Sequence, residues 1–206
     1  MRTEQSFQID ENAWRNPNDV AVHWHQAKLI NPNIMRYKEK GSFWETLAKY
    51  GLAVLVGREY EHFVLSLTTE NGAPHVTYLP LPHPSGIAIR EGSYRINIAS
   101  TRNPNQIFTL APCAVDNNEK QSIGKLTLIP VSSTIVPGHL YIHDLAWVDR
   151  TLYGVSAGRN AVVELGENGF WEDRWWPKSL DAIGMNRSMQ NWLQLNSMAA
   201  GKTLVR

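Results

Sequence analysis

Three short segments of this chain are variants of one phrase. They are residues 85–89 (Ser-Gly-Ile-Ala-Ile), 143–147 (His-Asp-Leu-Ala-Trp) and 196–200 (Asn-Ser-Met-Ala-Ala). Their first residues lie 58 and 53 positions apart, which is close to the length of one four-stranded β unit with a generous loop. A repeat of this length constrains the fold strongly, because each copy must be a unit of similar structure packed against the next. We call these segments the first, second and third phrase.

The residues after each phrase favour β-strands. The first two phrases are followed by β-rich segments at residues 94–100 and 106–110, and at residues 151–157 and 160–165. An earlier pair at residues 52–57 and 63–68 lacks an opening phrase. The pattern predicts an all-β fold: a partial or truncated β-propeller of repeated antiparallel blades, with one short N-terminal helix. The alternative is an all-β protein whose strands resemble one another by coincidence.

The expected organisation has two parts. Residues 1–40 form an irregular N-terminal segment with a possible strand at residues 20–25, and residues 41–206 form the blade repeats, with the last blade incomplete. The helix is expected to begin at Ser42, because Ser42 and Glu45 have the spacing of a capping box. Phe43, Trp44, Leu47 and Ala48 would form its apolar stripe, and Gly51 would end it in a left-handed conformation.

Composition narrows the classes of function. The 206 residues carry a formal net charge of +1, which argues against nucleic acid or an anionic membrane as a partner. The sequence contains no apolar stretch of the roughly 20 residues that would span a bilayer. The first residues are polar, so a cytoplasmic protein is expected. The single cysteine, Cys113, lies beside a proline in an expected loop, and we interpret it as incidental.

Tryptophan is unusually frequent, with eight residues in the chain, and five of them lie in the C-terminal third. Clustered aromatic rings can form a platform for a sugar or a base, but they can also fill the space between neighbouring blades. Packing is the interpretation we favour.

The candidate site residues are His143, Asp144 and Asn196, because the start of each inner strand opens at the same end of a central channel. Adjacent residues of a strand point to opposite faces, so His143 and Asp144 can both face the channel only if the backbone bends there. The structural alternative is that such side chains bind loop amides and hold a blade in place. Asp144 and Asn196 could also contribute to a calcium site, although calcium prefers six or more oxygen ligands.

A family resemblance is carried by residues 81–88, 142–146 and 195–199. They resemble an uncharacterised bacterial family of propeller-type conserved hypothetical proteins with Pro-x-Gly-Leu-Ala, His-Asp-Leu-Ala and Leu-Asn-Gly-Leu-Ala repeats. The resemblance implies the fold but no activity. More distantly, the phrases resemble six-bladed lactonase-like propellers, which hold a divalent metal with Glu, Asn and Asp side chains. That resemblance implies Asp144 and Asn196 as metal ligands, but Ser85 and Gly86 stand where a third acidic ligand would be expected.

We therefore expect a binding module that engages a small molecule or a protein partner at the channel mouth, with no cofactor. The alternative is a calcium-dependent hydrolase of lactones or esters, whose catalytic residues the sequence does not identify. A third hypothesis is a structural or assembly role. If the chain is complete, an oligomer is expected, because another chain would then have to cover the open sheet edges.

Overall fold

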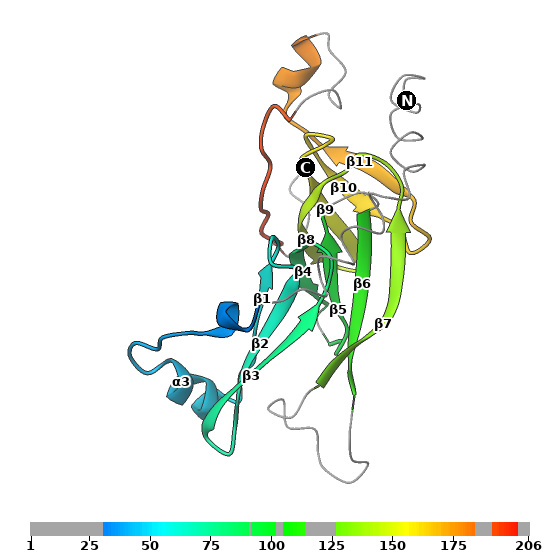
Figure 1. Ribbon diagram of the computed structural model, residues 1–206. Coiled ribbons are helices and arrows are strands. Elements are labelled where there is room, and N and C mark those ends of the chain that lie inside the picture. The colour runs from blue at the N-terminus through cyan, green and yellow to red at the C-terminus, as the bar shows by residue number, and fades with distance from the viewer. Residues whose placement is uncertain (1–30, 91, 102–104, 114–126, 184–190, 202–206) are drawn as a thin grey trace.

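Three antiparallel sheets follow one another along the chain in the computed structural model (Figure 1). The structure describes residues 31–90, 92–101, 105–113, 127–183 and 191–201. The first sheet contains β1 (Val54–Arg58), β2 (Phe63–Glu70) and β3 (Ala73–Pro80). The second contains β4 (Pro84–Ile89), β5 (Ile96–Ser100), β6 (Asn105–Cys113) and β7 (Thr127–Val136). The third contains β8 (Ile142–Val148), β9 (Thr151–Ser156), β10 (Ala161–Leu165) and β11 (Trp171–Trp175).

Each sheet is a meander in which every strand pairs with the next strand along the chain. The two earlier strands expected at residues 52–57 and 63–68 are confirmed as β1 and β2, and the first two phrases lie in β4 and β8. β4 packs against β8, and β1 packs against β4, so the first strands of the two four-stranded sheets lie side by side. We call β4 and β8 the inner strands.

The second sheet is the middle layer, and β5 shows why. All five residues of β5 are buried, because its two faces pack against different sheets. Ile96 and Ile98 belong to the core shared with the first sheet, whereas Ala99 belongs to the core shared with the third. On that second face, Asn97 accepts a hydrogen bond from Nε1 of Trp147 at 3.1 Å. Because successive side chains of a strand point to opposite faces, β5 contributes to both interfaces of the middle layer.

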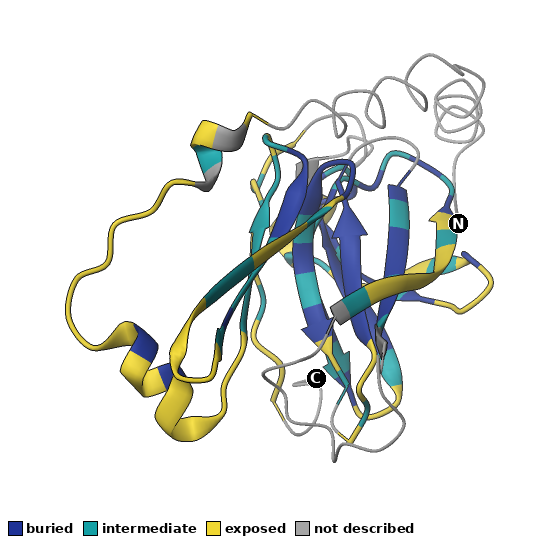
Figure 2. Ribbon diagram, turned by 60° about the horizontal axis from the view of Figure 1, so that its bottom comes forward, coloured by how far each residue is buried: buried dark blue, intermediate teal, exposed yellow. Residues whose placement is uncertain are grey.

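Burial is concentrated in the second and third sheets (Figure 2). Their shared core has Leu140, Ile142 and Val163 at its centre, each fully buried. Trp147, Trp171 and Trp176 pack against the same core while remaining partly exposed. For these three rings the structure confirms packing between sheets.

One α-helix, α3 (Phe43–Tyr50), is present in the described part of the chain, and it packs on β2 through Trp44 and Leu47. It ends at Gly51, whose φ of 61° is the expected left-handed conformation. The expected capping box is wrong: the Ser42 side chain makes no cap hydrogen bond. Ser42 has φ −101° and ψ 38°, outside the extended region that an N-cap side chain needs to reach the first-turn amides. Its carbonyl instead accepts from the N–H and hydroxyl of Thr46.

Two short 3-10 helices, η1 (Pro32–Met35) and η3 (Lys178–Ile183), complete the elements. Cys113 ends strand β6, so the expected loop position of this residue is wrong. The strand expected at residues 20–25 lies outside the described residues. None of the helices in the described segments is long and apolar enough to cross a membrane.

Among the described residues the fold is all-β with one short α-helix, as expected, and its face-to-face meander sheets are consistent with the blades of a partial propeller-like fold. The inner strands of neighbouring sheets begin at the same end of the molecule. In each four-stranded sheet, the turn between the second and third strands also lies at that end, because the strands are antiparallel. We call it the entrance end.

Candidate functional site

The three phrases lie side by side at the entrance end. The Ser85 hydroxyl donates to the backbone oxygen of His143 at 2.8 Å, which joins the first phrase to the second. The backbone N–H of Met198 donates to Oδ2 of Asp144 at 2.9 Å, which joins the third phrase to the second. Segments 58 and 54 residues apart in sequence are thereby brought together.

The chain enters each phrase with the same unusual backbone conformation. His83, Tyr141 and Gln194 have φ of 43°, 47° and 47°, and each lies two residues before the first residue of a phrase. Positive φ is uncommon for residues other than glycine. The third phrase therefore shares the entry geometry of the two inner strands, although residues 191–201 contain no assigned strand.

Both inner strands are irregular close to their first residues. In β8, Ile142 and Asp144 pair with consecutive residues of β9, so His143 is an extra residue. β4 has a comparable register shift between Pro84 and Ile87. Such a bulge bends the strand and breaks the strict alternation of side chains. It supplies the bend that His143 and Asp144 need if both are to face the same end.

The inner strands approach each other most closely at Gly86. A Cβ atom placed on Gly86 would lie 2.5 Å from Cα of Asp144 and 2.6 Å from the backbone N of Leu145. Real side chains do not approach a backbone this closely, so only glycine allows the contact.

Both carboxylate oxygens of Asp144 bind backbone amides. Oδ1 accepts from the N–H of Leu145 at 2.9 Å, and Oδ2 accepts from the N–H of Met198. A carboxylate that accepts N–H groups forms charge-assisted hydrogen bonds, which are stronger than neutral ones. Asp144 therefore positions the third phrase against β8.

A side chain at a strand turn binds the segment that leads to each phrase. Nδ1 of His62 accepts from the N–H of His83 at 3.2 Å, and Oδ1 of Asn105 accepts from the N–H of Tyr141 at 3.0 Å. Oδ1 of Asn160 accepts from two consecutive N–H groups, those of residues 192 and 193, at 2.8 and 3.1 Å. All three side chains are buried, with at most 7% of their surface exposed. We call His62, Asn105 and Asn160 the linker-binding residues.

A polar cluster surrounds His62, the first of the linker-binding residues. The rings of His62 and His83 are nearly perpendicular, with centroids 4.2 Å apart. Thr101 donates from Oγ1 to Oε1 of Glu59 at 2.8 Å, and that oxygen lies 4.0 Å from Nδ1 of His83. Three of these residues are at least nine-tenths buried: His62, His83 and Thr101. The junction of the first two sheets is therefore polar at the entrance end.

The turn between β1 and β2 also carries an ion pair. The Arg58 guanidinium donates to the Glu61 carboxylate, and this hydrogen bond holds the pKa of Glu61 below its usual value. About a third of each side chain is exposed, so the pair orients the turn and adds little stability.

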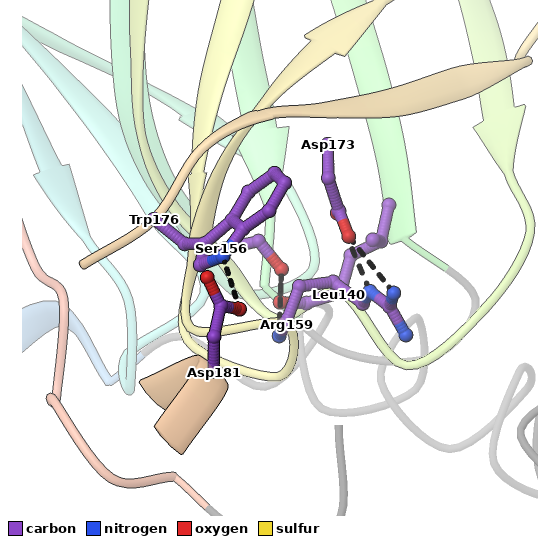
Figure 3. A network of polar contacts seen from close by, with 6 residues as sticks. All are labelled: Leu140, Ser156, Arg159, Asp173, Trp176 and Asp181. Atoms are coloured by element: carbon purple, nitrogen blue, oxygen red, sulfur yellow. Dashed lines mark hydrogen bonds and ion pairs between the residues drawn. The ribbon is translucent and has the colours of Figure 1, made fainter. Parts of the chain in front are cut away.

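The corresponding turn of the third sheet is fixed by a network centred on Arg159 (Figure 3). Its guanidinium pairs with Asp173 at 2.9 Å and lies over the ring of Trp171, 5.1 Å from the centroid. The hydroxyl of Ser156 accepts from the backbone N–H of Arg159 and donates to the carbonyl of Leu140. These contacts hold the turn from which Asn160 binds residues 192 and 193.

Within the described ranges, no group of three or more His, Cys, Asp or Glu side chains is arranged to hold a metal ion. Asp144 and Asn196 would therefore need further ligands from backbone, neutral side chains or water.

A family described as Domain of unknown function (DUF4915) matches residues 41–206, which include all three phrases. The chain belongs to the DUF4915 family. This agrees with the expected membership of an uncharacterised family. No curated protein sequence matches the chain.

In this DUF4915 domain the predicted site residues differ in their surroundings. His143 and Asp144 are half-buried at the start of β8, and Asn196 is exposed. It is the backbone of Met198, two residues after Asn196, that contacts Asp144. The structure thus brings the second and third phrases together, and the binding roles of the three residues remain predictions.

The linker-binding residues and the Glu59 cluster escaped the sequence analysis. Polar residues in turns between apolar strands are ordinary, so His62, Asn105 and Asn160 gave no distinctive signal. A comparison of the three turns at matching positions would have found one polar side chain in each.

We expect Gly86→Ala to lower the free energy of unfolding by at least the roughly 1–3 kcal/mol typical of overpacking, because the new methyl group meets backbone that cannot move aside. Ser85→Ala is the matched control. It adds no atoms and removes one hydrogen bond, worth about 1 kcal/mol. Urea denaturation followed by tryptophan emission measures both. Equal stability of the two variants would contradict the close contact.

We expect Asp144→Ala to cost about 1.5–3 kcal/mol, because two backbone N–H groups lose a charged acceptor. Asp144→Asn should cost less, since the amide retains one acceptor oxygen. The control is Asp149→Asn, at an exposed turn residue with φ 55° that asparagine tolerates. Denaturation midpoints test the order, and an Asp144→Ala variant as stable as the control would refute the positioning role.

Proposed function

We infer that the DUF4915 domain is a binding module whose ligand site lies at the entrance end of the inner strands. In this proposal the sheets are blades around a common axis, and the phrases form the mouth of the channel. The observation that carries it is the pair of contacts joining the three phrases, Ser85 to His143 and Met198 to Asp144. They gather His143 and Asn196 near a positioned carboxylate.

The chemistry of this end favours a small hydroxylated ligand. Imidazole and amide groups each offer both a donor and an acceptor, which matches the hydroxyl groups of a sugar or polyol. Of the five described histidines, four lie at the entrance end in or beside the strand turns and phrases: His62, His83, His139 and His143. His143 and Asn196 are accessible enough to reach a ligand, whereas the buried linker-binding residues support the frame.

A thermal-shift screen with glucose, gluconate, myo-inositol and N-acetylglucosamine tests the proposal. Ligand binding to the folded state raises its stability by mass action, by about 2.7 kcal/mol at a concentration one hundred times the dissociation constant. We expect at least one compound to raise the melting temperature of the wild-type protein, and His143→Ala and Asn196→Ala to abolish the shift.

The matched control for that screen is His75→Ala. His75 lies on β3 beside Glu70, 3.5 Å away, and away from the entrance end. It should leave the shift intact. A shift that survives both site variants, or that disappears with His75→Ala, would rule out the proposed site. If none of the compounds binds and a protein partner does, the hydroxylated-ligand assignment is wrong.

The alternative, a calcium-dependent hydrolase of lactones or esters, is separable by metal titration. Both Asp144 oxygens already accept backbone N–H groups, which supports a positioning role over a metal-ligand role. We therefore expect millimolar CaCl₂ to leave the melting temperature and tryptophan emission unchanged, and gluconolactone hydrolysis to remain at the buffer rate. Stabilisation by calcium that Asp144→Asn removes, together with lactone turnover, would favour the hydrolase.

A further inference from the structure

The first sheet contains no described strand at the inner position. Its linker-binding residue, His62, directly precedes β2, whereas Asn105 is the first residue of β6 and Asn160 directly precedes β10, which are the third strands of their sheets. β1 also packs against β4 as β5 packs against β8. β1 therefore corresponds to β5 and β9, which are second strands. The described strands of the first sheet are its second, third and fourth.

The exposure of β1 agrees with this assignment. All five residues of β1 are only half-buried, whereas all five residues of β5 and five of six in β9 are buried. β5 pairs with an inner strand on one edge, but the described partner of β1 is β2 alone. β1 has the largely apolar sequence Val-Leu-Val-Gly-Arg. The backbone N–H and C=O groups along its other edge can form hydrogen bonds with another strand.

The third phrase complements β1, because it resembles an inner strand that has no described second strand beside it. It has the left-handed entry residue of an inner strand, Gln194, and it contacts the preceding inner strand through Asp144 and Met198. In the described residues it pairs with no second strand. The contact with Asp144 holds it beside β8, whereas β1 lies beside β4.

We propose that the third phrase of one copy of the chain pairs with β1 of a second copy, along the edge that has no partner strand among the described residues, and that the exchange is reciprocal. The two copies are then related by a two-fold axis, because the same contact is made twice. Such a pair holds six sheets in a closed ring, within the four to eight blades of propellers. The proposal does not depend on the ligand proposed above.

The register follows from the existing sheets. In the third sheet, whose turn before Asn160 has the same length as the turn before His62, Leu145, Ala146 and Trp147 pair with Gly154, Tyr153 and Leu152. The equivalent residues of the third phrase are found by counting forward from the first residue of each phrase. Those of β1 are found by counting backward from the linker-binding residue of each sheet. The expected pairs between copies are Met198 with Val56, Ala199 with Leu55, and Ala200 with Val54.

Light scattering on the 206-residue protein during gel filtration provides the first test. We expect twice the 23.3 kDa of one chain, with a return to one chain on dilution or in Ala199→Pro. A proline at position 199 removes a backbone donor from the proposed strand pair and leaves the N–H of Met198 to bind Asp144. Its circular dichroism spectrum should match that of the wild-type protein.

Cysteine cross-linking tests the register. In a Cys113→Ser background, Ala200→Cys in one copy and Val54→Cys in a differently tagged copy should form a disulfide-linked pair on mild oxidation. Ala200→Cys with Thr77→Cys is the matched control, because Thr77 is exposed on β3 of the same sheet. A single-chain mass across micromolar concentrations would overturn the proposal. So would a dimer in which the control pair cross-links as readily as the proposed pair.

Discussion

The close backbone contact between β4 and β8 at Gly86 is the constraint on which the arrangement of sheets depends. With a Cβ atom 2.5 Å from the backbone of Asp144, any other residue would force the inner strands apart. The same contact brings Ser85 within hydrogen-bond distance of His143 and places Asp144 where it reaches the third phrase. The core between the second and third sheets can then close, with Leu140, Ile142 and Val163 fully buried.

Successive sheets are also tied by side chains that bind backbone. His62, Asn105 and Asn160 differ chemically, but each presents an acceptor to an N–H in the segment that leads to the next phrase. Because these side chains are buried, losing one would leave an amide without water or protein partner, which costs more than an exposed hydrogen bond. The position of each phrase is thereby coupled to a strand turn in the preceding sheet.

Asp144 has a different role from His143 and Asn196, and this difference bears on function. The carboxylate of Asp144 is engaged by two backbone amides, so its first role is to position the third phrase. His143 precedes Asp144 in β8 and Asn196 lies two residues before Met198; both are accessible to a ligand, which supports the proposed binding module. An entrance end built from a rigid frame and a few accessible polar groups resembles ordinary small-molecule sites, where few polar groups fix the ligand's orientation.

Much of the local structure could be predicted from the sequence. Alternating apolar residues and turn signals indicated β1, β2 and the strands after the first two phrases, and Gly51 indicated the end of α3, because such features depend on neighbours along the chain. The sequence by itself determined the all-β class, the short helix and the spacing of the three phrases. The tertiary structure alone decided that Gly86 contacts the backbone of Asp144 and that the Ser42 side chain does not cap α3. It also decided that His62, Asn105 and Asn160 bind the segments that lead to the phrases. Those three bind partners 21, 36 and 32 residues away, and a contact over such a distance is set by how the sheets pack.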